Sequence, residues 1–538
     1  MCISAYLKDK GYDVSCLNLN HYDSSKLADV LRKNHFDIVA TGEMFTRFKL
    51  IRAIIETTRE YSPSSKIVLG GAIATGDPEF ILNELLPDYL VLGEGEVTME
   101  LLVQAIKNNS DIHGVTGIAF KENGTIVNTK PTPLIEDLDE LPYPDYEGFE
   151  YGYYMNNFIP KKQHLQAIMD TSKRRLANVM ASRDCMMKCT FCFRIMGGGY
   201  RTRSIKKFFG EISYLIDKYS INELFMQDDI LAPDKKRILE FCKTIKSMNL
   251  PWSCYLRVTK SDKDIIDIMK DAGCYEITYG LESASPVVLK SMRKGITPKL
   301  MKKAIELTTI AKINIPGNFI FGDLAENLNT MDETLRFLRK FAPAFTGLKL
   351  ISPYPGTVLY EKYKIKYGTK NLISYYLNPL IRANITSLSE MDYTYMAQKI
   401  NFEHYYHRLR SKGKILNSKK IAPQTHELDV RCPHCEGENI NCKIDFNEGY
   451  QLICKYCFQT FFINKANFRF GNISQMYQFC YLYIKKLVLH NVYIYRLLFF
   501  IPPLIEKTAC IFRAVVNLSK KNYISLKKPL DIKSEALR

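Results

Sequence analysis

The N-terminal fifth of the chain alternates between two hydrophobic periods. Helical spacing of apolar residues covers 3–11, 26–33, 50–61, 78–85 and 95–107, and short apolar runs typical of strands cover 13–19, 37–41, 66–69 and 89–92. Strands that alternate with helices predict a doubly wound parallel sheet, whose ligands bind beyond the carboxyl ends of the strands. Two of the runs end in glycine turns, at Gly70-Gly71 and at Gly93-Glu94-Gly95. Because glycine lets a ligand approach the backbone closely, we expect these turns to form a ligand cradle.

The same alternation returns in the middle of the chain. Helical patterns cover 208–219, 235–248, 262–272, 297–311 and 331–340, and strand-like runs cover 223–227, 252–258, 276–280, 314–321 and 347–351. About six β/α units of this length predict a parallel partial barrel with its functional residues at the carboxyl ends of the strands. Between the two alternating regions, an Asn123-Gly124 turn and the prolines from Pro131 to Pro144 indicate a hairpin and a stiff linker.

The last third of the chain has a different pattern. Residues 358–425 are largely helical and rich in tyrosine, which suits core packing or a lid over the barrel mouth. From Met476 onward, aromatic and leucine runs are interrupted by basic residues, and none reaches the roughly 18 apolar residues that span a bilayer. Such a tail suits an interfacial helix attracted to anionic lipid, and equally a pair of helices packed on the barrel.

These patterns divide the chain into six segments. They are a doubly wound domain (1–110), a linker (111–165), a partial barrel (166–360), a helical extension (361–425), a cysteine-rich ribbon (426–465) and a basic aromatic helical tail (466–538). With 538 residues, 46% of them hydrophobic and 24% charged, the composition suits several folded domains and excludes disorder throughout.

Net charge and cysteine usage bear on the cellular compartment and on the partners of the protein. The fifteen cysteines are clustered rather than spread as a disulfide framework, and the start of the chain shows no signal-peptide pattern, so we expect a reducing cytoplasm. The net charge of +17 is compatible with nucleic acid, an anionic membrane surface or an acidic protein partner, and equally with a generally lysine-rich proteome.

Three cysteines stand just before the barrel pattern. Cys185, Cys189 and Cys192 lie four and three residues apart, with the aromatic Phe191 directly before the last. A structural zinc normally takes four protein ligands, whereas an iron–sulfur cube held by three thiolates keeps one iron open to a small molecule. We therefore predict an iron–sulfur cluster here, the alternative being a chance grouping in a cysteine-rich chain.

Four further cysteines form two Cys-x-x-Cys knuckles after the helical extension. Cys432 and Cys435 are followed, after 18 residues, by Cys454 and Cys457. Four thiolates on two hairpin turns suit a closed tetrahedral zinc site, which is structural rather than catalytic. Cys442 lies between the knuckles, and we expect it to be packed rather than ligating.

Polar residues mark the ends of several barrel strands. Asp228-Asp229 ends the first strand after the three cysteines, and only one of the pair can face a ligand because adjacent strand residues point to opposite sides; we favour Asp228. An acidic turn that caps the next helix explains the pair equally well. Arg257, one strand later, can clamp a carboxylate, and Glu282 follows the strand after that. Gly322 ends a glycine-bearing strand that an adenine can approach closely.

The order of these motifs resembles the radical S-adenosylmethionine (radical SAM) superfamily over about residues 178–360. The matching motifs are the three cysteines, Arg201-Thr202-Arg203-Ser204, Asp228-Asp229, Arg257, Ala272-Gly273-Cys274, Gly280-Leu281-Glu282-Ser283, Met292-Arg293-Lys294-Gly295, Phe321-Gly322 and Pro355-Gly356-Thr357. The segment before them, up to residue 107, resembles the cobalamin-binding domain that precedes many radical SAM domains. The resemblance implies a [4Fe–4S] cluster on the three cysteines, with S-adenosylmethionine bound at its open iron.

The resemblance also implies roles for the other motifs. Asp228 or Asp229, together with Arg257 and Glu282, would help to hold S-adenosylmethionine, and Gly322 would line its adenine side. In the preceding domain, the two glycine turns identified above would contribute to cobalamin binding. The zinc site belongs to neither resemblance and rests on the cysteine spacing alone.

The activity implied is radical chemistry. An enzyme of this kind cleaves S-adenosylmethionine reductively to a 5′-deoxyadenosyl radical, which abstracts hydrogen from an unactivated carbon of a small-molecule or lipid-like substrate. Methylcobalamin then delivers a methyl group to that carbon. Radical oxidation or ring closure without methyl transfer is one alternative, and a non-catalytic cofactor-binding membrane-associated scaffold is another. We expect an acidic electron carrier such as flavodoxin or ferredoxin, peripheral contact with the inner face of the membrane through the tail, and no nucleic-acid partner.

The chain departs from the resemblance in three places. Met1 falls almost inside the first helix, so we expect a truncated sheet that lacks its central strand. No Asp-x-His-x-x-Gly motif offers a lower ligand to cobalt, and we expect the nearby His21 to be a solvated loop residue. Asp323-Leu324-Ala325-Glu326 stands where the family more often has Pro-Gly-Glu, which changes the substrate side of the site.

Overall fold

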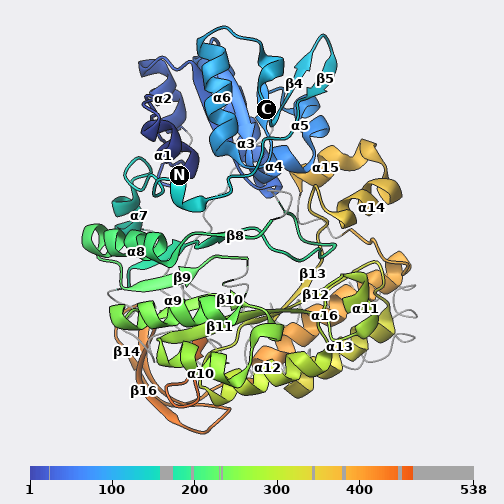
Figure 1. Ribbon diagram of the computed structural model, residues 1–538. Helices are drawn as coiled ribbons and strands as arrows, with labels where there is room; N and C mark the ends of the chain where they lie inside the picture. The colour runs from blue at the N-terminus through green and yellow to red at the C-terminus, as the bar shows by residue number, and fades with distance from the viewer. Residues whose placement is uncertain are drawn as a thin grey trace, which may run out of the picture.

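The computed structural model describes residues 1–22, 25–157, 174–194, 199–229, 231, 234–341, 346–378, 383–423, 425–445 and 451–463. The predicted aromatic tail, residues 466–538, and its membrane contact lie outside these residues. Figure 1 shows an N-terminal α/β domain above a half-barrel, with a small β-sheet against the far side of the barrel. Searching the described part of the chain reveals no helix with the length and hydropathy that crossing a bilayer requires.

The N-terminal domain is built on a five-stranded sheet in the order β1-β2-β3-β4-β5. Its strands are β1 (Ile38–Gly42), β2 (Lys66–Gly70), β3 (Tyr89–Val91), β4 (Ile118–Glu122) and β5 (Thr125–Asn128). Its helices are α1 (Cys2–Asp9), α2 (Ser25–Lys33), α3 (Phe48–Tyr61), α4 (Gly71–Gly76), α5 (Pro78–Glu84) and α6 (Gly95–Lys107). The first three strands run parallel, and the predicted Asn-Gly hairpin supplies the two antiparallel strands.

Strand β2 shows why helices cover both faces of this sheet. Ile67 and Leu69 pack in one apolar cluster with residues of α3, whereas Val68 packs in a second cluster with residues of α6. Successive strand residues point to opposite faces, so a strand that is apolar throughout needs a cover on each side. The prediction of a doubly wound domain is confirmed.

The predicted strand over 13–19 is wrong. These residues leave α1 as irregular chain, and among the described strands β1 pairs only with β2. An apolar run becomes a strand only where a neighbour supplies partners for its backbone N–H and C=O groups. No described strand lies beside this run, so its apolar residues pack without joining a ladder.

The barrel is a six-stranded parallel sheet in the order β13-β12-β11-β10-β9-β6. Its strands are β6 (Leu176–Val179), β9 (Glu223–Met226), β10 (Trp252–Leu256), β11 (Cys274–Glu282), β12 (Gly317–Phe321) and β13 (Thr346–Leu350). The covering helices are α8 (Ile205–Tyr219), α9 (Lys235–Met248), α10 (Lys263–Asp271), α11 (Pro286–Ser291), α12 (Pro298–Ile310) and α13 (Leu328–Phe341). The half-barrel prediction is confirmed, with β6 as a strand that its four-residue length had hidden.

A short ribbon and one helix connect the two domains. Strand β7 (Ser182–Arg183) pairs antiparallel with β8 (Arg201–Thr202), and helix α7 (Tyr151–Asn157) ends the proline-rich linker. In Figure 1, β8 lies between the N-terminal domain and the half-barrel. The ribbon therefore carries the chain into the cysteine loop at the junction of the two domains.

The helical extension packs on both domains. Helices α14 (Val358–Tyr367) and α15 (Leu372–Leu377) join the apolar cluster of α3, and α16 (Glu390–Arg410) packs on α13 and β13. Four of its tyrosines, Tyr375, Tyr376, Tyr393 and Tyr395, are buried. These contacts are those of core packing, and the lid over the barrel mouth stays a prediction.

The end of the extension is a strand, not a helix. Strand β14 (Lys414–Lys420) forms an antiparallel sheet with β15 (Thr425–Arg431) and β16 (Glu438–Asp445), and β17 (Gln451–Ile453) pairs with β18 (Thr460–Phe462). The predicted boundary near residue 425 thus cuts through one sheet. The lysines of β14 alternate poorly with apolar residues because this edge strand is exposed on nearly its whole length.

Candidate functional site

The three cysteines lie on a loop that leaves β7 at the barrel mouth. Asp184 turns the chain in a left-handed conformation, with φ of 65°, directly before Cys185. The loop then rests on the segment after α11, because the Thr190 amide donates to the Met292 carbonyl at 3.1 Å and the Cys189 thiol approaches the Arg293 carbonyl at 3.8 Å. One backbone and one side-chain contact thus hold the cysteine loop on the segment after α11.

Cys189 and Cys192 share one electrostatic environment. Desolvation raises the pKa of Cys189 and raises that of Cys192 to about 12, although the Cys192 residue as a whole is exposed, and the nearby Lys294 cation opposes both shifts. Each of these thiols also senses a neighbouring cysteine of the set. Three free thiols near a solvent-open pocket suit a cluster that keeps one open site, and loading it would release their protons.

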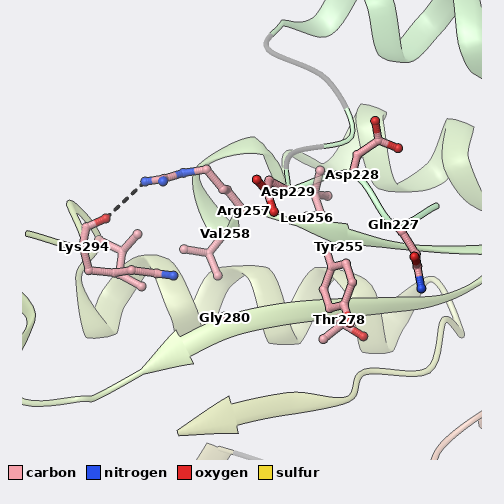
Figure 2. Close-up of a pocket in the computed structure, with 11 residues that line it drawn as sticks. Gln227, Asp228, Asp229, Tyr255, Leu256, Arg257, Val258, Thr278, Gly280 and Lys294 are labelled. Carbon is pink, nitrogen blue, oxygen red and sulfur yellow. Dashed lines mark hydrogen bonds between the residues drawn. The ribbon is translucent and has the colours of Figure 1, made fainter. Parts of the chain in front are cut away.

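A pocket of about 240 Å³ opens at the carboxyl ends of β9, β10 and β11. Its lining residues are Gln227, Asp228, Asp229, Tyr255, Leu256, Arg257, Val258, Thr278, Gly280, Lys294 and Ile296 (Figure 2). Parallel strands present their last residues at one edge, which is why side chains far apart in the sequence meet there. The predicted residues Asp228, Asp229 and Arg257 therefore lie in one cavity.

Arg257 and Lys294 place two cations on one wall of the pocket. The guanidinium of Arg257 donates to the Lys294 carbonyl at 3.2 Å, as the dashed line in Figure 2 shows, and Gly295 lies against the same guanidinium. The Lys294 ammonium pairs with Glu282 at 2.8 Å, and their side chains are only 15% and 7% exposed. Glu282 thus sits beside the pocket with a cation of this chain already bound to it.

The two adjacent carboxylates have different surroundings. Asp228 is 1% exposed and accepts hydrogen bonds from the Ala181 amide at 2.9 Å and from the Ser182 hydroxyl, while its Oδ2 has no partner among the described residues. Burial raises the pKa of Asp228 to about 7. Asp229 is exposed, and Figure 2 shows the two side chains pointing to different sides. The strand alternation is as expected, but Asp229 offers the freer carboxylate.

Gly322 follows β12 beside a buried acidic turn. Its φ is +96°, and a Cβ there would lie 3.5 Å from the ring of Tyr393. The Glu326 carboxylate accepts from the Gly322 amide at 3.3 Å, and burial raises the pKa of Glu326 to about 7. The Asp323–Glu326 sequence, which replaces the Pro-Gly-Glu of the family, therefore closes this turn through the Glu326 carboxylate. The turn also contacts Tyr393 of the helical extension.

The glycine turns of the N-terminal domain meet the protein's own backbone. Gly71 has a φ of +76°, and a Cβ there would lie 3.1 Å from the Glu43 amide nitrogen. Gly70 is the last residue of β2, Gly93 follows β3, and Gly95 begins α6. All four glycines stand at the carboxyl edge of the sheet, where this fold class binds its ligands. Their spacing fits a ligand cradle, and close packing of the strands accounts for Gly71 by itself.

Glu94 is engaged by two arginines rather than open to a ligand. Its carboxylate pairs with Arg183 at 2.8 Å and with Arg201 at 2.9 Å, and it accepts from the Ile135 amide at 2.9 Å. These charged and backbone donors lower the pKa of Glu94 against the effect of burial. Glu94 therefore connects the N-terminal domain to the β7–β8 ribbon that leads into the barrel.

His21 is buried, so the expectation of a solvated loop residue is wrong. It is 8% exposed, with its ring nitrogens 3.0 Å from the Asn18 amide and 3.3 Å from a Glu150 oxygen. Polar partners on both sides let the ring be buried without loss of hydrogen bonds. Both nitrogens are thereby occupied within the chain.

The four cysteines of the two knuckles converge as predicted. One sulfur each from Cys432, Cys435, Cys454 and Cys457 lies within 4.8 Å of the others, with Cys432 to Cys457 at 3.8 Å and Cys435 to Cys454 at 3.6 Å. Tetrahedral ligation at about 2.3 Å requires sulfurs at this separation. Cys442 is buried outside the set and approaches the Asn439 carbonyl, so it is packed rather than ligating.

Several site residues were not assigned from the sequence. Lys294 lies in the Met292–Gly295 motif, which matches the superfamily. Its positive charge was the feature that could have marked it as a partner for the predicted acid Glu282. Gln227, Tyr255 and Thr278 line the pocket from strand positions whose alternation could have placed them there. Arg183 precedes the first cysteine by two residues, but nothing local in the sequence points to its partners across the domain junction.

Comparison with known proteins matches this two-part architecture. A B12 binding domain model matches residues 1–103, and a radical SAM superfamily model matches residues 179–338. An uncharacterised methyltransferase of Pyrococcus horikoshii is 30% identical over 342 residues, which are 63% of this chain and 71% of that protein. The anaerobic magnesium-protoporphyrin IX monomethyl ester cyclase of Cereibacter sphaeroides is 27% identical, with 69% of this chain and 60% of that enzyme covered.

Solved structures share the fold at lower identity. The radical SAM methyltransferase TsrM from Kitasatospora setae, with cobalamin and a [4Fe–4S] cluster bound, superposes with a TM-score of 0.56 at 18% identity, covering 68% of this chain and 72% of that one. The cobalamin-dependent radical enzyme OxsB with aqua-cobalamin bound gives 0.54 at 21% identity, covering 69% and 53%.

The fold and the cysteine loop together define a class of protein in which a B12-type domain is joined to a cluster-bearing half-barrel. The chain belongs to the radical SAM superfamily, among the members that carry an N-terminal B12 binding domain. It is a cobalamin-dependent radical SAM enzyme, and its relatives include methyltransferases and cyclases. Family membership supports a [4Fe–4S] cluster, S-adenosylmethionine and cobalamin as cofactors.

Proposed function

We propose that this enzyme transfers a methyl group to an unactivated carbon of a small-molecule substrate. The observation that carries the proposal is the contact between the carboxyl edge of the N-terminal domain and the cysteine loop. A Cβ on Gly76, at the end of α4, would lie 2.8 Å from the Pro355 carbonyl oxygen, and one on Gly356 would lie 2.5 Å from the ring of Phe193. Phe193 directly follows Cys192, so the edges of the two proposed cofactor sites meet here.

The residues around the junction have distinct tasks in this proposal. Cys185, Cys189 and Cys192 would hold the cluster, whose reduction of S-adenosylmethionine supplies a 5′-deoxyadenosyl radical while methylcobalamin supplies the methyl group. Arg257 and Lys294 would bind the carboxylate of S-adenosylmethionine, because both cations face the pocket wall nearest the thiols.

Other groups of the site would orient rather than react. Asp229 would accept hydrogen bonds from a ribose or an amino group, since it is the exposed carboxylate of the pair. Phe191 packs on the apolar cluster of the N-terminal domain and so helps to exclude water between the two cofactors. The four glycines of the N-terminal edge would line the cobalamin site.

The pocket also offers a surface to a substrate. Tyr255 is 41% exposed while it lines the cavity, and its ring centroid lies 5.4 Å from that of Phe225. An exposed aromatic side chain beside polar groups suits a small molecule with an apolar part. We further propose an acidic flavodoxin or ferredoxin as the reductant, attracted by the net charge of +17, and zinc as the metal of the four-cysteine site.

Anaerobic reconstitution tests the proposal. Protein loaded with iron, sulfide and cobalamin should release 5′-deoxyadenosine from S-adenosylmethionine, and Cys189→Ala should reduce the release by at least about a thousandfold because one cluster corner is lost. Equal release by wild type and variant would disprove the radical mechanism. Retention of cobalamin through gel filtration, followed by transfer of a labelled methyl group, separates methylation from ring closure, the activity of the cyclase relatives.

A further inference from the structure

The segment that leads into the cysteine loop is held from two sides. On the barrel side, the buried Asp228 accepts from Ala181 and Ser182. On the other side, the next residue, Arg183, reaches into the N-terminal domain. Cys185 follows only two residues later, so any shift of this segment moves the first cluster ligand.

Arg183 binds two carboxylates of the N-terminal domain at once. Its Nη1 donates to Glu94 at 2.8 Å and its Nη2 donates to Glu96 at 2.6 Å. Both acids stand at the start of α6, and the three side chains are between 4% and 10% exposed. A guanidinium that bridges two carboxylates fixes direction as well as distance, which a lysine cannot reproduce.

The neighbouring strand of the ribbon repeats the connection. Arg201, which is paired with Arg183 across β7 and β8, donates to Glu94 at 2.9 Å and to the Ile135 carbonyl of the linker at 2.7 Å. It also lies 3.9 Å from the carboxylate of Asp184, the residue before Cys185. Two arginines of one ribbon therefore tie the cysteine loop to the glycine turn that follows β3.

We propose that Arg183 is a positioning residue that fixes the cysteine loop relative to the N-terminal domain, and so sets the geometry between the cluster and the cobalamin site. The inference rests on the proposed function, since it assigns the relative placement of its two cofactors. Arg183 acts through Glu94 and Glu96 on one side and through the chain to Cys185 on the other.

The first test uses the protein without cofactors. Hydrogen exchange should show that Arg183→Gln speeds amide exchange at least about tenfold in the peptides that contain Cys185 and the start of α6, with the remaining barrel unchanged. Arg59→Gln is the matched control, because Arg59 forms an exposed pair with Asp88 at 2.7 Å inside the N-terminal domain. Unchanged exchange at both peptides in Arg183→Gln would overturn the proposal.

The second test reads the loaded cluster. Arg183→Gln should keep its iron content but change the electron paramagnetic resonance line shape of the reduced cluster with S-adenosylmethionine, and lower cleavage about tenfold. Arg183→Lys should restore the cluster signal only in part. A wild-type line shape and wild-type cleavage in Arg183→Gln would refute the positioning role, whereas absence of cleavage in the wild type would instead refute the proposed function.

Glu96→Gln keeps the test decisive should Arg183→Gln fail to fold. It removes one of the two carboxylates and leaves the pair between Arg183 and Glu94 in place. The same two peptides should exchange faster, by a smaller factor than in the arginine variant. Wild-type exchange in Glu96→Gln would then stand against the proposal.

Discussion

The molecule carries two groups of cysteines at opposite ends of the barrel, and they differ in how completely the protein encloses them. The cysteine loop lies at the carboxyl ends of the strands, where Cys192 is exposed and Cys189 half-buried. The four-cysteine site lies between the β15–β16 and β17–β18 hairpins. Cys432 and Cys454 are buried there at 1% and 0% exposure, Cys457 is half-buried and Cys435 is exposed. Three thiolates at an open mouth leave room for a reactant, while four thiolates in a closed fold leave none.

The supporting contacts differ in the same sense. At the four-cysteine site, backbone amides of His434 and Tyr456 donate to the sulfurs of Cys432 and Cys454 at 3.3 and 3.4 Å. At the barrel mouth, the neighbours of the thiols are the charged side chains of the pocket wall. Hydrogen bonds to sulfur hold a structural metal in place, whereas charged groups beside an open site can bind a second molecule.

Removing one thiolate from the closed site should have the largest effect on structure and nearly none on chemistry. Cys457→Ala leaves three ligands, so we expect loss of the bound metal and unfolding of the small sheet, since structural zinc contributes on the order of 10 kcal/mol to such folds. Cleavage of S-adenosylmethionine should stay within about twofold of wild type. Metal analysis and circular dichroism measure the first effect, and Cys442→Ala is the matched control. A collapse of cleavage alongside metal loss would show that the two ends are coupled.

The β17–β18 hairpin, which carries two of the four cysteines, contacts the barrel directly, and this makes that outcome informative. Thr460 donates to Asn314 at 2.9 Å, and the Lys270 ammonium lies 4.1 Å from the ring centroid of Phe458. Asn314 and the nearby Tyr275 stand at the amino ends of barrel strands, away from the pocket. Contacts at that end of a barrel serve stability rather than catalysis.

A cation at the open site should matter for ligand binding. Lys294→Gln removes the partner of a buried carboxylate, Glu282, as well as one charge of the pocket wall. Loss of a charged hydrogen bond to the ligand carboxylate costs about 1.5–3 kcal/mol, so affinity for S-adenosylmethionine should fall roughly tenfold to a hundredfold. Equilibrium dialysis with reconstituted protein measures it. Lys263→Gln, from an exposed pair with Asp267, should bind as wild type does; equal affinity in both variants would remove Lys294 from the site.

The two cysteine groups and their places in the fold could largely be predicted from the sequence, because they rest on local patterns. Cysteine spacing identified both groups, and the alternation of strands and helices placed one of them at the mouth of a half-barrel. The enclosure of Asp228, the pairing of Glu94 with two arginines and the burial of His21 were not accessible. Each depends on a partner 40 or more residues away in the sequence, except for the local contact of His21 with Asn18. Periodicity shows which face a residue takes, not which distant side chain meets it.

The element boundaries failed for a related reason. The run over 13–19 has the composition of a strand, yet strands exist only as pairs, and pairing is a property of the assembled sheet. Strand β14 is the opposite case, a strand that the sequence pattern does not predict. Its exposed lysines show no apolar alternation, and its hydrogen-bonded pairing with β15 makes it a strand. Helices were predicted more faithfully because their hydrogen bonds are internal.

The smallest effect concerns the support of the open site and its dependence on pH. The pKa of Asp228 is raised to about 7 from an ordinary 3.8 by burial, so the native protein holds a proton that the unfolded chain releases at lower pH. The stabilisation is therefore complete below pH 3.8 and is lost as pH rises through 7. Between about pH 5 and 8 the wild type should lose about 2 kcal/mol that Asp228→Asn, which cannot titrate, retains.

The Asp228→Asn side chain is isosteric with the protonated acid. Its amide group would occupy the place of the unpartnered Oδ2, while its oxygen would still accept from Ala181. Thermal unfolding of the cofactor-free protein at about pH 5, 6, 7 and 8 measures the difference, with Asp262→Asn, from an exposed pair, as control. Parallel pH profiles for wild type and Asp228→Asn would mean that the carboxylate is ionised in the native state. The segment before Cys185 would then be held by hydrogen bonds to a charged acceptor.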